Sequence, residues 1–167
     1  MVKLSFSKRE NCPDFKLELY KGTNPIPFSI SIGNVAYLPS TIYSRNMYDG
    51  GMVEYRFDER DRKLYEITLV VLRNIKCFST NSMSLTDDGN FYDCKLCNKS
   101  CEQLDTEPMI IQKGINSITI SFLNHEVSKY FKIAVNVFIG VSVEGYLAEI
   151  TLDNLLDVQM KQIFGFV

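Results

Sequence analysis

The stretch KYFKIAVNVFIGVSVEGYLAEIT, from Lys129 to Thr151, decides the fold. In its first part every second residue is apolar, namely Phe131, Ile133, Val135, Val137, Ile139, Val141 and Val143. A period of two places these side chains on one face of a β-strand, whereas an amphipathic helix repeats its apolar positions every three or four residues. We therefore predict one long central strand here, bent or bulged at Gly140.

Shorter alternations elsewhere predict further strands. They cover residues 2–8, 15–20, 28–32, 53–58, 65–72 with a continuation to 78, 109–112 and 117–123. The runs at 53–58 and 65–72 are expected to pair as a hairpin. Residues 40–51 are predicted to form a loop, and a second, cysteine-containing loop region is predicted at about 79–108.

The period changes near the C-terminus. Apolar residues from Leu155 to Phe164 are spaced by three and four, which predicts a helix over 153–164 with Asp153 as its N-cap and Gly165 as its stop. The sequence thus predicts an all-β fold, mainly an antiparallel β-sandwich or curved sheet of about eight to ten strands, with one C-terminal α-helix.

The length of 167 residues fits a single β-rich domain spanning 1–167. Hydrophobic residues make up 46% of the chain, enough to build a core without disulfides. We expect no membrane span, because no apolar run reaches about eighteen residues, and no signal peptide, because the N-terminus lacks an apolar core. A cytoplasmic location is therefore expected, with the five cysteines as reduced thiols or metal ligands.

The segment FYDCKLCNKSC, from Phe91 to Cys101, contains the most specific motif in the chain. Its C-x-x-C part, YDCKLCNKS, resembles the opening half of a two-Cys, two-His zinc finger, but the chain has one histidine and lacks the second half. A structural zinc site could combine Cys94, Cys97 and Cys101 with Cys77, Cys12 or His125. The alternative is a surface loop with reduced thiols, and we expect no other cofactor.

The sequence offers no catalytic set. A nucleophile–histidine pair would have to use His125, which is expected to be an exposed turn residue, and no G-x-S-x-G or phosphate-binding glycine motif occurs. Carboxylates that could act as a pair, such as Glu54 with Asp58, are expected to be solvated on a charged strand face. We therefore predict that the protein is not an enzyme.

The net charge of −2 is unevenly distributed. Between Leu85 and Glu107 six acids face only Lys95 and Lys99, and no dense basic stripe occurs anywhere. Nucleic acid is therefore a poor candidate partner, and a basic protein is a better one. Alternatively, these acids simply form solvated faces and loops.

In its general character, a small all-β chain with acidic loops and no catalytic set, the protein is similar to bacterial immunity proteins. These neutralise a cognate toxin, including the nuclease toxins of contact-dependent inhibition. The resemblance implies a protein-binding module that covers the active site of a basic toxin. It implies contacts from Asp87, Asp88, Asp93, Glu102, Asp105 and Glu107, with Tyr43, Tyr48 and Tyr92 as aromatic anchors.

Two other function classes remain open. A zinc-stabilised nucleic-acid-binding or regulatory domain would use the Cys94, Cys97 and Cys101 knuckle with its two neighbouring lysines. A structural or assembly subunit with jelly-roll character, such as a capsid or tail component, would reveal itself as a large oligomer.

Overall fold

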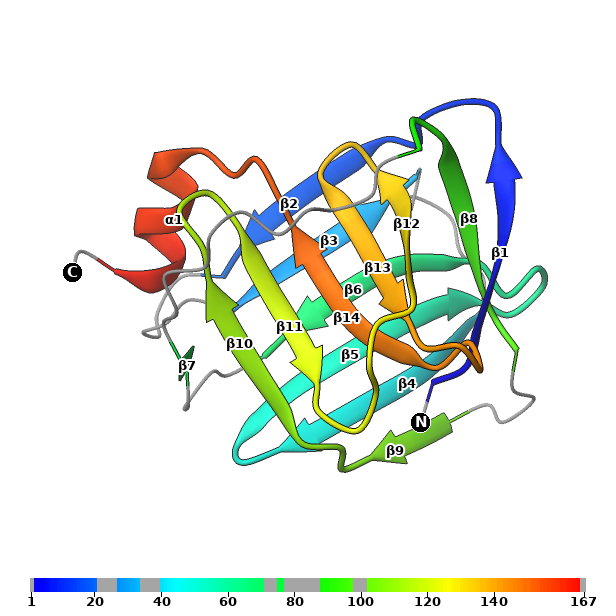
Figure 1. Cartoon of the computed structure of the whole chain (residues 1–167), viewed down its shortest axis with the longest axis horizontal. Coiled ribbons are helices and arrows are strands. Elements are labelled where there is room, and N and C mark those ends of the chain that lie inside the picture. Colours follow the sequence, from blue (N-terminus) through cyan, green and yellow to red (C-terminus); the bar gives the residue numbers. More distant parts are fainter. Residues whose placement is uncertain are drawn as a thin grey trace.

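The computed structural model describes residues 2–20, 27–33, 40–70, 75–76, 88–97 and 102–165. These residues form fourteen strands and one helix, arranged as two six-stranded sheets and a two-stranded ribbon. Figure 1 shows one large sheet in front of the other, with the helix at one end and the ribbon at the opposite end. The predicted all-β fold with a single C-terminal helix is confirmed.

The first large sheet, called the β4 sheet below, has the strand order β2-β3-β6-β5-β4-β9. Its strands are β2 (Phe15–Leu19), β3 (Phe28–Ile32), β4 (Thr41–Tyr48), β5 (Gly51–Asp58), β6 (Leu64–Leu69) and β9 (Glu102–Asp105). Neighbours pair antiparallel except for β9, which runs parallel to β4 at one edge. The predicted hairpin is confirmed as the β5–β6 pair, although β6 ends at Leu69.

The second large sheet, called the β14 sheet, has the order β12-β13-β14-β11-β10-β7. Its strands are β12 (Lys129–Ala134), β13 (Val137–Val141), β14 (Leu147–Leu152), β11 (Ile118–Phe122), β10 (Met109–Lys113) and β7 (Ile75–Lys76). The expected continuation of residues 65–72 to residue 78 is wrong, because β7 pairs with β10 in this other sheet. The remaining strands, β1 (Leu4–Arg9) and β8 (Phe91–Leu96), form the antiparallel β1–β8 ribbon.

One apolar core joins the two large sheets. Its largest members are at most 2% exposed, and they include Phe28, Tyr55 and Phe57 from the β4 sheet and Ile118, Ile139 and Ile150 from the β14 sheet. Burial of apolar surface on this scale is the main stabilising term for a domain of this size.

The stretch from Lys129 to Thr151 forms three strands instead of the one predicted. β12 turns at Val135 and Asn136 into β13, and a second turn at Gly145 leads to β14. A bulge between Lys132 and Ala134 shifts the register of the first hairpin. This shift keeps odd-numbered residues of both strands on the buried face. The apolar alternation in the sequence therefore continues through the turn, and the pattern alone does not indicate that a turn is present.

The register shift predicted at Gly140 is confirmed in the β13–β14 pair. A Cβ atom added to Gly140 would lie 2.9 Å from Cε1 of Tyr130 and 3.1 Å from both methyl groups of Val127. A side chain at this position would therefore require Tyr130 and Val127 to shift.

Three other predictions are corrected. The predicted loop at 40–51 contains β4, whose inward positions include the buried polar residues Ser44 and Asn46 and therefore lack an apolar alternation. The predicted loop region at 79–108 contains β8 and β9. The helix α1 spans Asp157–Phe164, so Leu156 and not Asp153 precedes its first turn. Gly165, with a φ of 77°, ends α1 as predicted.

Two aspartate substitutions test the hairpin. Val137 is fully buried in β13, whereas Val135, two residues earlier, is 53% exposed in the turn. Val137→Asp should abolish cooperative thermal unfolding, because it buries an unpaired charge. Val135→Asp should change the free energy of unfolding by no more than about 0.5 kcal/mol. Equal damage by both substitutions would instead favour one continuous buried strand.

Candidate functional site

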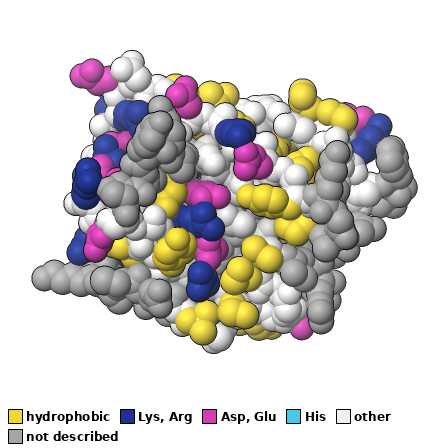
Figure 2. Space-filling view, turned by 180° about the vertical axis from the view of Figure 1, so that it is seen from behind, with side chains coloured by type: hydrophobic (Ala, Val, Ile, Leu, Met, Phe, Trp, Pro, Cys, Tyr) yellow, Lys and Arg dark blue, Asp and Glu magenta, His cyan; other side chains and the backbone are white. Residues whose placement is uncertain are grey.

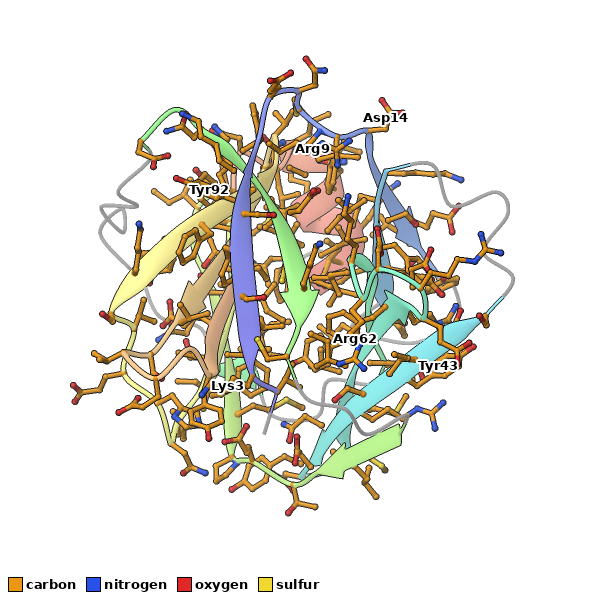
Figure 3. All side chains as sticks on the ribbon, turned by 90° about the vertical axis from the view of Figure 1, so that its right-hand side faces the viewer. Lys3, Arg9, Asp14, Tyr43, Arg62 and Tyr92 are labelled. Atoms are coloured by element: carbon orange, nitrogen blue, oxygen red, sulfur yellow. The ribbon has the colours of Figure 1, made fainter. Side chains whose placement is uncertain are left out.

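The residues that the sequence predicts as partner contacts lie in two separate places. Asp88, Tyr92 and Asp93 lie on or beside β8, whereas Tyr43, Tyr48, Glu102, Asp105 and Glu107 lie on β4, on β9 or just after β9. Figure 3 shows Tyr92 and Tyr43 on opposite sides of the β1–β8 ribbon. Asp87 lies outside the described residues. The structure therefore divides the predicted acidic residues between two regions.

Backbone hydrogen bonds at one end of the β1–β8 ribbon join it to both large sheets. The amide of Leu4 donates to the carbonyl of Gly145 at 2.9 Å, and this hydrogen bond connects β1 to the turn before β14. The amide of Leu96 donates to the carbonyl of Arg62 at 3.0 Å, and the backbones of Lys63 and Lys95 form an isolated antiparallel β-bridge. These two contacts connect β8 to the residues just before β6 of the β4 sheet. Figure 3 shows the ribbon running across this side of the molecule, with Arg9 near its other end.

Asp93 binds two cations within the chain. Its carboxylate lies 3.3 Å from the guanidinium of Arg9 and 3.0 Å from Nζ of Lys63, and its side chain is only 18% exposed. The hydrogen bond with Asp93 is the main cause of a raised pKa at Lys63. Asp93 therefore links β1, β8 and the start of β6 electrostatically.

A pocket of about 140 Å³ lies beside Asp93, where β8 and the beginning of β6 flank it. Its lining combines apolar, aromatic and charged residues. These are Ile32, Leu64, Cys94 and Ile133, then Tyr65 and Tyr92, and finally Arg9, Lys63, Asp58, Asp61 and Asp93. Residues from β1, β3, β5, β6, β8 and β12 thus meet in one concave site, called the ribbon pocket below.

The C-x-x-C motif begins on strand β8, so Cys94 lies neither in a metal-binding knuckle nor in a surface loop, the two alternatives that the sequence left open. Cys94 faces inward from β8 and is 3% exposed, and burial raises the pKa of its thiol. Cys97 follows the end of β8 and is exposed, as is Cys12. Within the described part of the chain, no three potential ligand side chains come close enough to hold a metal ion. Cys77 and Cys101 lie outside that part.

A ladder of charges crosses the outer face of the β4 sheet. Glu54 on β5 accepts bonds from Nε of Arg45 at 2.6 Å and from Nε of Arg56 at 2.8 Å. Arg56 also binds Glu66 on β6 at 3.0 Å. Figure 2 shows basic and acidic side chains alternating across the middle of this face, with hydrophobic groups beside them. The sequence alone does not predict the ladder, because its four members come from three different strands.

Tyr43 on β4 is held between the two arginines of this ladder. The guanidinium carbon of Arg45 lies 5.4 Å from the centre of the Tyr43 ring, and that of Arg56 lies 5.5 Å away. Cation–π attraction at these distances fixes the ring on the surface. Tyr43, a predicted partner contact, is thus positioned in advance of any binding.

Glu54 is not solvated as we expected, because it is 5% exposed. Burial alone would raise the pKa of its carboxyl, but the bonds and charges of Arg45 and Arg56 outweigh this effect and lower the pKa. The ladder therefore contributes to stability only while Glu54 is ionised.

Large apolar side chains are exposed where β4 meets β9. Leu104 on β9 is opposite Arg45 in the register and is 64% exposed, while Met47 and Tyr48 on β4 are 48% and 41% exposed. Asp49 and Gly50 connect β4 to β5 with φ values of 49° and 76°, as in a tight hairpin turn. We call the sheet edge formed by β4 from Tyr43 to Tyr48 and by β9 the β4–β9 edge.

His125 and Glu107 belong to a structural network. The backbone of Glu107 exchanges hydrogen bonds of 2.7 and 2.9 Å with the side-chain amide of Asn46. Its carboxylate lies 3.1 Å from Nε2 of His125, whose ring stacks on Tyr146. The expectation of an exposed His125 is wrong, since its side chain is only 11% exposed. Glu107 therefore anchors the chain between β9 and β10.

Tyr65 connects the ribbon pocket to the charge ladder. Its ring lines the pocket, and its hydroxyl forms a 2.6 Å hydrogen bond with the hydroxyl of Thr41 on β4. The pKa of Tyr65 is raised mainly by burial, while the nearby charge of Arg56 opposes this shift. The ribbon pocket therefore lies next to the start of β4, and the ladder and the β4–β9 edge follow further along this strand.

Comparison with known proteins does not assign the chain to a family: no family model matches it, and no curated protein matches it. No helix within the described ranges has the length and apolar character needed to cross a membrane.

Alkylation of the native protein tests the placement of the cysteines. Iodoacetamide at mildly alkaline pH should modify Cys12 and Cys97, because their thiols are exposed. Cys94 should react only after unfolding in urea, because its thiol is buried and its pKa is raised. Peptide mapping by mass spectrometry distinguishes the sites. Reaction of Cys94 at the rate of Cys97 in the native protein would contradict its place in the core.

The pH dependence of stability tests the charge ladder. Because folding lowers the pKa of Glu54, the stability it adds is present above the ordinary glutamate range and is lost as the pH falls through the lowered value. Glu54→Gln should therefore cost about 1–3 kcal/mol at neutral pH and much less in acid, as measured by urea unfolding. Glu18→Gln is the matched control, since Glu18 is 41% exposed. A cost for Glu54→Gln that does not depend on pH would contradict the ionised ladder.

Proposed function

We propose that the protein is a non-catalytic protein-binding module that contacts its partner through the β4–β9 edge. The observation that carries this proposal is the exposure of Met47, Tyr48 and Leu104 on two neighbouring strands. Met47 and Leu104 lie on the same face of the sheet, since Leu104 pairs in register with Arg45, two residues before Met47. Exposed apolar groups that lie together on soluble proteins commonly mark interaction surfaces. Tyrosine and methionine are also enriched at such surfaces.

The charges around the β4–β9 edge favour a basic partner. Glu102 and Asp105 lie on β9, and Asp49 lies in the turn beside Tyr48. The two arginines of the ladder add no net positive charge, because they are ion-paired with two glutamates. A net negative charge on these elements accelerates association with a positively charged surface.

As the biological role we propose toxin neutralisation, with the chain acting as an immunity protein for a basic, nuclease-type toxin. A nuclease cleft that binds a phosphate backbone is positively charged. A sheet edge that offers carboxylates beside tyrosine and leucine has the complementary charge and the apolar area needed to cover such a cleft. This role does not require catalytic residues in the chain itself.

The test is to capture the partner and then to assay it. The tagged chain is incubated with extract of its source cells at low and at moderate salt, and native mass spectrometry gives the mass and stoichiometry of each complex. A stoichiometric basic partner whose nuclease activity disappears when the purified chain is added supports the proposal. A partner that stays fully active in the complex contradicts neutralisation, and a chain without any stoichiometric partner contradicts the binding function.

Substitutions on β9 should weaken this complex. Leu104→Asp removes apolar contact and Asp105→Lys reverses a charge, so we expect each to raise the dissociation constant at least about tenfold. Asp105→Lys should also slow association. The control is Asp157→Lys on the exposed face of α1, which should leave binding unchanged. Surface plasmon resonance with the captured partner gives the rates, and equal losses in all three variants would exclude the β4–β9 edge as the specific contact.

A further inference from the structure

We propose that the ribbon pocket receives one single-ring aromatic side chain, a phenylalanine or a tyrosine, from the protein partner. This inference rests on the proposed function and specifies the partner's anchoring group. Tyr65, which lines the pocket, is hydrogen-bonded to Thr41 at the start of β4, and the β4–β9 edge begins two residues further along that strand. A partner seated on the edge can therefore reach the pocket without a change in the fold.

The size of the ribbon pocket selects a single ring. Its volume is about 140 Å³. Cavities of about 150 Å³ in protein cores hold a benzene molecule, whereas sites for whole small-molecule ligands usually measure about 300–1,000 Å³. The pocket is therefore large enough for one side chain with a single ring and too small for most cofactors or for an indole together with its backbone.

The charges of the ribbon pocket select a neutral occupant. Arg9 and Lys63 line it and pair with Asp93 and Asp61, so an inserted arginine or lysine would have to displace one of these cations from its carboxylate. Asp58, Asp61 and Asp93 also line it, so an inserted carboxylate would be repelled in turn. The cations and carboxylates largely compensate one another through the ion pairs of Asp93 and Asp61. A neutral group enters without leaving any of these charges unpaired.

The lining of the ribbon pocket favours an aromatic group over an aliphatic one. The rings of Tyr65 and Tyr92 are among its lining groups, and Tyr92 already makes an edge-to-face contact with Phe131 at 5.0 Å. The sulfur of Cys94 is a further favourable neighbour for a ring. Ile32, Leu64 and Ile133 supply the apolar surface that its burial requires. Pockets that enclose one large aromatic side chain are typical places for the anchoring residue of an interface.

The first experiment uses p-cresol, which reproduces a tyrosine side chain, as a probe of the wild-type protein. Titration followed by NMR of labelled isoleucine methyl groups should give saturable shifts at Ile32 and Ile133, with a dissociation constant of about millimolar strength. Ile118, fully buried between the sheets, should not shift. Methylguanidinium and acetate, the matched charged probes, should not shift the pocket methyls. Absence of saturable shifts with p-cresol, or larger shifts with either ion, would overturn the inference.

The second experiment fills the pocket. Ile32 ends β3 and is 9% exposed, so Ile32→Phe places a ring in the pocket from within the chain. This variant should lose the p-cresol shifts at Ile133 and bind the captured partner at least about tenfold more weakly. Ile110→Phe on β10, in the other sheet, is the matched control and should change neither. Thermal unfolding verifies that both variants fold, and the wild-type titration remains decisive if Ile32→Phe does not.

Failure of this inference differs from failure of the proposed function. If the partner binds wild type and Ile32→Phe equally, the pocket is not the anchoring site although the protein-binding function stands. If p-cresol binds the pocket but no stoichiometric partner is captured, the proposed function fails, and the inference that depends on it is overturned as well.

Discussion

The backbone hydrogen bonds that hold one end of the β1–β8 ribbon are the constraint on which the shape of the molecule depends. Leu4 is hydrogen-bonded to Gly145 beside the β14 sheet, and Leu96 is hydrogen-bonded to Arg62 beside the β4 sheet. These contacts join the two sheets along one side, so that apolar residues of both can share one core. At the far end of the ribbon, side chains connect it to the β4 sheet, chiefly through the ion pairs of Asp93 with Arg9 and Lys63. The ribbon pocket lies at this end because ion pairs, unlike ladder hydrogen bonds, do not require the strands to touch.

The ion pairs on the β4 sheet have a structural effect as well as an electrostatic one. Glu54 is buried and would be costly to ionise alone, but two arginines from neighbouring strand positions compensate its charge. The same arginines hold the ring of Tyr43 between them. A flat face with fixed rotamers loses little conformational entropy when a partner binds, which is the physical advantage of arranging it in advance.

Periodicity predicted the fold class and the strand content correctly, because a period of two requires only local sequence. It failed at Val135, where a bulge preserved the alternation through a hairpin turn. It failed again at β4, whose inward Ser44 and Asn46 are polar, and at β8 and β9, where the cysteine motif suggested a loop. The ribbon pocket was not predictable, since it assembles residues from six strands. Tyr43 was predicted as a partner contact, but its contact with Arg56 was not, because strand pairing brings these two residues together.

Charge counts along the sequence suggested one acidic surface, and the structure explains why such counts mislead. Asp93 and Glu107 are both half-buried and bind cationic or imidazole groups of the chain itself, so their first effect is to connect strands and loops. Most of the charge on a folded chain is compensated in this way, and compensated pairs contribute little to recognition. Exposed apolar groups are not compensated by anything within the chain. For this reason Met47, Tyr48 and Leu104, together with the apolar floor of the ribbon pocket, locate the proposed interface better than the density of acids does.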